Sequence, residues 1–146
     1  MNRKVSLLLC MCCAGNMCQA DPVAQIRECQ KKINAGTDRF EEAEANRKML
    51  EVASSNAAKM KVKPQLTALF PRNANNSINN ISEQDRKKAT LHILLLEAFP
   101  WDSLIVTRAV EELLDLPSVS KQNLKNMLQT LRPANNSPIN KWIQRI

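Results

Sequence analysis

The chain has 146 residues, with 21 Lys or Arg against 14 Asp or Glu, and its formal net charge is +7. It holds two glycines and no tyrosine, and it has few β-branched runs, which argues against a β-sheet and against a glycine-rich phosphate loop. The composition therefore predicts a basic, all-α protein.

The first twenty residues have the order of a secretory signal peptide. Arg3 and Lys4 give a positive start, an apolar run follows over residues 5–14, and Cys-Gln-Ala occupies positions 18–20. The apolar run is shorter than the ~20 residues that a membrane-spanning helix needs. We expect residues 1–20 to be cleaved after Ala20, with Ala14 as the second choice.

Four of the five cysteines, Cys10, Cys12, Cys13 and Cys18, lie in this segment. They form no paired CxxC motifs, which structural zinc sites usually have, so no metal site is expected. We interpret them as small hydrophobic residues of the signal peptide. Lipid attachment to a retained N-terminus is the alternative.

Residues 21–146 are long enough for one domain with one modest core. Cys29 is the only cysteine left there, and an odd cysteine in an exported protein suggests an intermolecular disulfide or a free thiol. A homodimer bridged through Cys29 and a plain buried Cys29 therefore both stay open.

Three Asn-x-Ser sequons, at Asn75, Asn80 and Asn135, are candidate glycosylation sites in a eukaryotic protein. Asn-rich loops also produce this motif by chance. Pro138, directly after the serine of the third sequon, weakens the prediction at Asn135.

The N-terminal part, residues 21–63, is expected to hold two helices. The first runs from Pro22 to about Ala35, and the second runs from residue 37 or 38 to about Val62, where Pro64 ends it. Residues 64–81 are expected to be an Asn-rich loop. The expected apolar face of the second helix is Phe40, Ala43, Leu50, Ala53, Ala57 and Met60.

The C-terminal subdomain, residues 82–146, has the clearest helix signals. Ser82, Asp102 and Ser120 each precede an apolar pattern of helical period, and prolines follow the patterns. A last amphipathic turn covers residues 139–146. Together the segments predict a small bundle of four to six helices.

No catalytic motif is present, and we expect a non-enzymatic protein without a cofactor. His92 is the only histidine and lies in an apolar stretch, so a partly buried, hydrogen-bonded role is expected. An enzyme would require a cleft in which His92 faces a Glu or Asp.

Charge is distributed unevenly along the chain. Residues 82–117 hold four basic and seven acidic groups, net −3, whereas residues 118–146 hold five basic groups and no acid. The expected interaction patch consists of Lys121, Lys125, Arg132, Lys141, Trp142 and Arg145. Alternatively, Trp142 packs back onto the bundle and the charges pair with residues 102–115. The basic residues are too dispersed, and aromatic residues too few, to favour nucleic-acid binding.

These features predict a small secreted helical protein that binds a protein partner, as a factor of signalling, reproduction or host interaction. One alternative is a bacterial periplasmic or envelope accessory subunit of a secretion or conjugation apparatus. The other is a protein that binds membrane surfaces or polyanions through its basic C-terminal end. A mass shift on glycosidase treatment would favour the first.

Overall fold

The computed structural model describes residues 21–36, 38–71 and 81–146. These residues form helices and no strand, which confirms the all-α prediction, although the helices outnumber the four to six expected. The eight helices are α1 (Pro22–Asn34), α2 (Arg39–Ser54), α3 (Asn56–Lys61), α4 (Lys63–Leu69), α5 (Glu83–Ala98), α6 (Ser103–Leu114), α7 (Lys121–Thr130) and α8 (Pro138–Arg145). The predicted signal peptide and the sequons at Asn75 and Asn80 lie outside the described residues.

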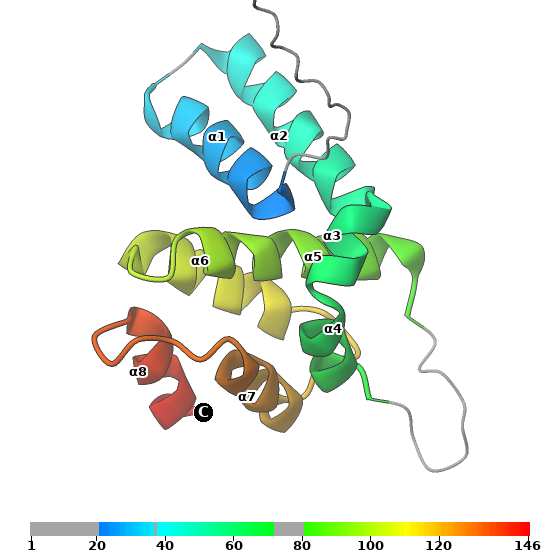
Figure 1. Cartoon of the computed structure of the whole chain (residues 1–146), viewed down its shortest axis with the longest axis vertical. Helices are drawn as coiled ribbons and strands as arrows, with labels where there is room; N and C mark the ends of the chain where they lie inside the picture. The colour runs from blue at the N-terminus through cyan, green and yellow to red at the C-terminus, as the bar shows by residue number, and fades with distance from the viewer. Residues whose placement is uncertain (1–20, 37, 72–80) are drawn as a thin grey trace, which may run out of the picture.

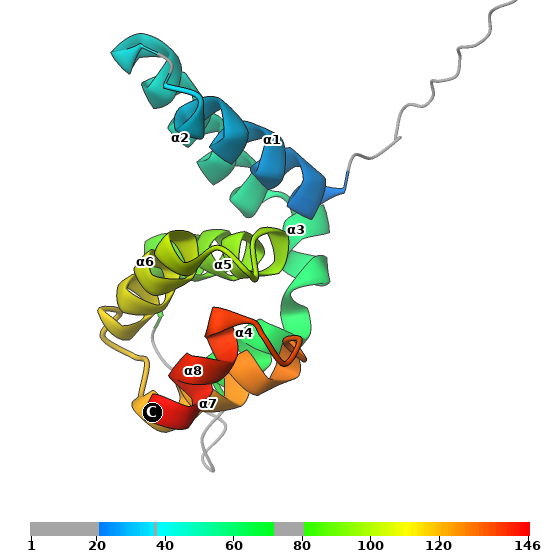
Figure 2. The ribbon, with the colours of Figure 1, turned by 90° about the vertical axis from the view of Figure 1, so that its left-hand side faces the viewer.

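The helices are arranged in three tiers (Figure 1). The α1/α2 hairpin forms one outer tier, α5 and α6 form the middle tier, and α4, α7 and α8 form the other outer tier. The short helices α3 and α4 run down one side of the molecule and link the first tier to the last, as Figure 2 also shows.

Most helices begin at a residue whose side chain satisfies a free backbone N–H group of the first turn. The Ser82 hydroxyl, for example, accepts a hydrogen bond from the Asp85 N–H at 3.0 Å, and Asp102 accepts from both Leu104 and Ile105. The expected caps at Ser82, Asp102 and Ser120 are confirmed.

The second predicted helix is interrupted at Ser55. Its backbone is extended (ψ 155°), so α2 ends there and α3 begins. The Ser55 hydroxyl donates to the Val52 carbonyl oxygen and accepts from the Ala58 N–H, at 2.7 and 3.1 Å. A serine side chain can replace helical hydrogen bonds in this way, which explains why one expected helix is two.

The helix α3 ends at Lys61, close to the expected end at Val62, but a new helix follows directly and includes Pro64. Pro64 lies in the first turn of α4, where its missing N–H group has no helical partner to lose. The start of the predicted 64–81 loop is therefore helical, and Leu69 of α4 is fully buried. Residues 72–80 lie outside the described part of the chain.

The predicted apolar face of the second helix is confirmed only at Ala53, which is fully buried. Phe40 is 85 % exposed and Met60 is 74 % exposed, whereas Met49 and Val52, which were not predicted, are buried. Half of the predicted face is alanine, which fits both a buried and an exposed surface, so the pattern did not fix the orientation of the helix.

The helix α5 is central, as its wide apolar arc predicts. It packs against α1 and α2 on one side and α6 on the other, and Ile93, Leu94 and Leu96 are completely buried. No helix of the described residues is long and apolar enough to span a membrane.

Candidate functional site

The helices α7 and α8 carry most of the predicted interaction patch, and they pack against each other. Leu124, Met127 and Leu128 form the buried face of α7, and Ile139 is the buried anchor of α8. This burial leaves charged positions toward solvent. The exposed or half-buried cations of this region are Lys121, Lys125, Arg132, Lys141 and Arg145, and we call them the basic C-terminal surface.

Trp142 does not project freely from α8. Its half-buried ring packs against the hydrophobic core, and the Arg145 guanidinium lies 5.3 Å from the ring centroid. This separation is within cation–π range. Trp142 therefore anchors α8 and orients Arg145, as the alternative interpretation of this residue expected.

The cations of the basic C-terminal surface form no ion pair with any described residue. All 14 acidic side chains of the protein belong to the described ranges, since residues 1–20, 37 and 72–80 contain no Asp or Glu. The expected pairing with residues 102–115 is thus not found.

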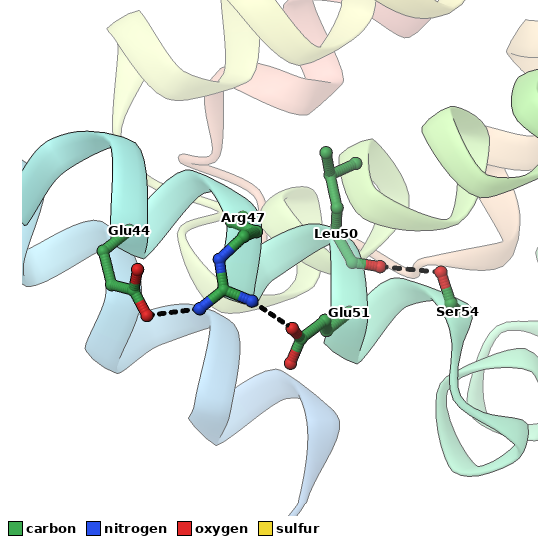
Figure 3. A network of polar contacts seen from close by, with 5 residues as sticks. All are labelled: Glu44, Arg47, Leu50, Glu51 and Ser54. Atoms are coloured by element: carbon green, nitrogen blue, oxygen red, sulfur yellow. Dashed lines mark hydrogen bonds and ion pairs between the residues drawn. The ribbon is translucent and has the colours of Figure 1, made fainter.

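The α1/α2 hairpin shows the contrasting arrangement. Arg47 pairs with both Glu44 and Glu51 on one exposed side of α2, and Ser54 donates a 2.8 Å hydrogen bond to the Leu50 carbonyl oxygen (Figure 3). These local pairs raise the pKa of Arg47, Glu44 contributing most. The charges of this helix are balanced within one element, so it has little net field to offer a partner.

Arg132 has a left-handed backbone with φ 49°, the only described non-glycine residue with positive φ. It follows the C-cap of α7, a place where glycine is preferred because other residues are strained there. A cation therefore occupies a position at which glycine would suit the backbone better.

A cavity of about 440 Å³ lies between the α1/α2 hairpin and the α5/α6 pair. Met49, Leu91, Leu95 and Ile105 supply much of its apolar wall. Its polar lining comes from four helices and consists of Gln30, Asn46, His92, Arg108, Glu111 and Glu112. Glu111 and Glu112 are adjacent in the sequence, but nothing local in the sequence indicates that four helices meet there.

His92 is partly buried, as expected, but the expected hydrogen bond is absent from the described residues. Its Nδ1 atom is buried and has no partner. Burial lowers the pKa of His92 below 6.5, Glu112 opposes this shift and Lys88 adds to it. The imidazole is therefore neutral at pH 7 and can accept a hydrogen bond at one ring nitrogen.

Cys29 lies on the buried face of α1 and is 5 % exposed. Burial raises the pKa of its thiol, Lys48 and Lys32 oppose the shift, and Glu28 adds to it. A disulfide to a second chain would require this face of α1 to become exposed first. The homodimer stays a prediction, and the buried location favours a packing role.

Asn135 is exposed in the turn before α8, but the serine of its sequon has a structural role. Ser137 is 4 % exposed, its hydroxyl donates to the Pro100 carbonyl oxygen, and it accepts from the Ile139 N–H at 3.1 Å. Ser137 thus caps α8 and joins it to the turn between α5 and α6.

No group of three or more His, Cys, Asp or Glu side chains that could hold a metal occurs in the described ranges. Comparison of the chain with models of known families, with curated proteins and with solved structures finds no match. Function must therefore be argued from the charges and the cavity themselves.

Proposed function

We propose that this protein is a secreted, non-enzymatic binding protein whose basic C-terminal surface docks on an acidic region of a protein partner. The observation that carries the proposal is that residues 118–146 hold five cations and no acidic side chain, and that none of these cations forms an ion pair with a described residue. Opposite charges on two proteins increase the association rate and select the partner.

The placement of Trp142 supports a protein partner over a membrane surface. A helix that lies in a membrane interface buries its large apolar side chains in lipid. In α8, however, Ile139 is 1 % exposed, and Trp142 and Ile143 pack against the protein's own core. Little apolar area of α8 is left for lipid, whereas its cations remain accessible.

The proposed location rests on residues 1–20, whose charge and hydropathy pattern is typical of an export signal. Export would place the basic C-terminal surface outside the cell or in a periplasm, where its partner would also be found. The intact mass of the protein recovered from its native cell tests this part, because export with cleavage after Ala20 predicts a chain that begins at Asp21.

Among the described residues, the cavity wall contains His92, Glu111 and Glu112, and it contains no Ser, Thr, Cys or Lys. His92 and Glu112 form no ion pair in the described structure. In the proposed function, these polar groups hold a ligand and do not react with it.

Binding to immobilised polyglutamate tests the proposed docking chemistry. The test variant replaces four cations of the surface with glutamine: Lys121→Gln, Lys125→Gln, Lys141→Gln and Arg145→Gln. A control variant loses the same charge from exposed lysines without ion pairs on other helices: Lys32→Gln, Lys61→Gln, Lys63→Gln and Lys88→Gln. The salt concentration that elutes each protein is measured.

We expect the test variant to elute at clearly lower salt than the control variant. Cations that lie close together on one surface can contact polyglutamate at the same time, whereas dispersed cations cannot. Equal elution of both variants would show that only net charge matters and would refute the proposal. Heparin and phosphatidylglycerol vesicles are run in parallel. Loss of binding to heparin or to the vesicles alone, with polyglutamate binding unaffected, would favour a sulfated polysaccharide or a membrane surface over an acidic protein.

A further inference from the structure

The cavity between the α1/α2 hairpin and the α5/α6 pair is a second feature that the basic C-terminal surface does not explain. We propose that it binds a small organic amine: an apolar body held between the helices, with its ammonium group at the wall formed by Glu111 and Glu112. This inference is independent of the proposed partner docking, since the cavity shares no residue with that surface.

The size and lining of the cavity suit a small molecule. Its volume of about 440 Å³ falls within the range of roughly 300–1,000 Å³ that is typical of small-molecule sites. Such sites combine mostly apolar walls with a few convergent polar groups. Here Met49, Leu91, Leu95 and Ile105 come from three helices and offer the apolar contact.

The charged groups of the lining favour a cationic ligand. Glu111 and Glu112 are both exposed at the cavity, and neither carboxylate forms an ion pair with a described residue. Arg108 is the only lining cation, and its exposed side chain can extend into solvent. A carboxylate ligand would face two like charges, whereas an ammonium group gains two acceptors.

His92 lines the cavity and does not oppose a cation there. Burial lowers the pKa of His92, so the ring is neutral at pH 7 and adds no positive charge to the wall. Its Nδ1 atom is itself buried and has no hydrogen-bond partner among the described residues, so a ligand in the cavity would contact the rest of the ring.

The side-chain amides of Gln30 and Asn46 complete the polar lining. Each amide can turn its carbonyl oxygen toward a donor, so neither opposes an amine. Gln30 belongs to α1 and Asn46 to α2, whereas the carboxylates belong to α6. A bound amine would therefore contact both tiers and hold the hairpin against the middle tier.

Three probes of nearly equal shape test the proposal: 2-phenylethylammonium, 3-phenylpropionate and the neutral 2-phenylethanol. His92 is the only histidine in the chain, so its ring Hε1 resonance in a proton NMR spectrum reports on the cavity without assignment. We expect the ammonium probe to shift this resonance in a saturable manner. The carboxylate should leave it nearly unchanged, and the alcohol should bind more weakly than the amine.

The variant Glu111→Gln with Glu112→Gln should raise the dissociation constant of 2-phenylethylammonium at least about tenfold, because two charge-assisted contacts are lost. Both side chains are exposed, so this variant should fold. Asp115→Asn is the control. Asp115 is an exposed acid that directly follows α6 and does not line the cavity, so its substitution should leave the affinity unchanged.

Two results would overturn the inference. The first is a carboxylate or alcohol affinity equal to that of the amine, which would show that charge does not select the ligand. The second is an unchanged His92 resonance with every probe at millimolar concentration, in a protein whose thermal unfolding confirms that it is folded. Polyglutamate binding is unaffected by either result, so the two proposals fail separately.

Discussion

Ser137 is expected to be critical for the attachment of α8, and replacing it with alanine tests this role. The substitution removes the hydroxyl that caps α8 through Ile139 and that donates to the Pro100 carbonyl oxygen. Loss of a serine N-cap costs about 1 kcal/mol, and loss of a hydrogen bond to a partly buried carbonyl costs about 1 kcal/mol more. We therefore expect Ser137→Ala to reduce the free energy of unfolding by about 2 kcal/mol.

This variant is also the usual test for glycosylation at Asn135, so the two effects must be separated. Asn135→Gln removes the same sequon from an exposed residue and keeps the cap. Urea unfolding of both variants, produced without glycans, measures the structural effect alone. We expect Asn135→Gln to match the unsubstituted protein within about 0.5 kcal/mol, as surface substitutions usually do.

Equal midpoints for Ser137→Ala and Asn135→Gln would refute this account of α8. Such a result would mean that the apolar contacts of α8, with Ile139 at their centre, hold the helix without the cap. A clear difference would instead warn against interpreting a Ser137 variant as evidence for a glycan, since the loss of stability has a structural cause.

Three further predictions concern the core, the backbone and the titration of a buried acid. Arg132→Gly should raise the free energy of unfolding in urea by up to about 1 kcal/mol, because glycine tolerates positive φ. The same variant should elute from polyglutamate at lower salt, because it loses a cation. A lower free energy of unfolding would contradict the strain argument. Leu69→Ala should lower the free energy of unfolding by about 2–5 kcal/mol, because Leu69 is fully buried in α4, which packs on α7. Leu50→Ala, at a 36 % exposed position, should lower it much less. Equal unfolding midpoints for the two variants would show that α4 is not part of the core. Burial raises the pKa of Glu97 above 4.5, with Lys61 opposing and Asp21 adding to the shift, so the folded state binds this proton more tightly than the unfolded chain does. The stability that this proton contributes is complete below pH 4.5 and is lost as the pH rises through the folded-state pKa. Glu97→Gln should therefore be more stable than the unsubstituted protein at pH 7 and equal to it at pH 4; an advantage that does not change with pH would refute the titration argument.

Local signals predicted the helices well wherever a polar cap met an apolar pattern. Ser82, Asp102 and Ser120 each begin a helix as expected, because capping depends on neighbours within three residues. Ser55 also caps a helix, but it lies inside a continuous helical pattern. The same side chain can be tolerated in a helix or can interrupt it, and the packing of α3 decides which occurs.

The orientation of α2 shows where the sequence pattern was too weak. The predicted face placed Phe40 toward the core, whereas the structure buries Ala45, Met49 and Val52. A helix rich in Ala and Glu, as α2 is, has few large apolar residues to fix its rotation. By contrast, the leucines of α5 surround much of the helix, and its central position could be predicted from them alone.

The cavity could not be predicted from the sequence. Gln30, Asn46, His92 and Glu112 come from four helices, and no spacing in the chain relates them. From the sequence, we could state only that catalysis would require His92 to face a Glu or Asp. Glu112 influences the pKa of His92, so the structure places a carboxylate near the ring, which no spacing in the sequence could show.

Surface charge illustrates the same division between local and tertiary effects. Glu44 and Lys48 have the i,i+4 spacing that favours an ion pair on a helix, but Arg47 pairs with Glu44 and also with Glu51. All these partners lie on one helix, so a local rule identifies the surface even though it selects the wrong cation.

Pairing between different helices follows another logic. The helix α6 contacts both α7 and α8, yet its carboxylates pair with none of the cations of the basic C-terminal surface within the described structure. Amphipathic helices meet through their apolar faces, so packing turns their charged faces away from the contact instead of toward each other. Ion pairs between these helices therefore do not neutralise the uneven distribution of charge along the chain in the described structure.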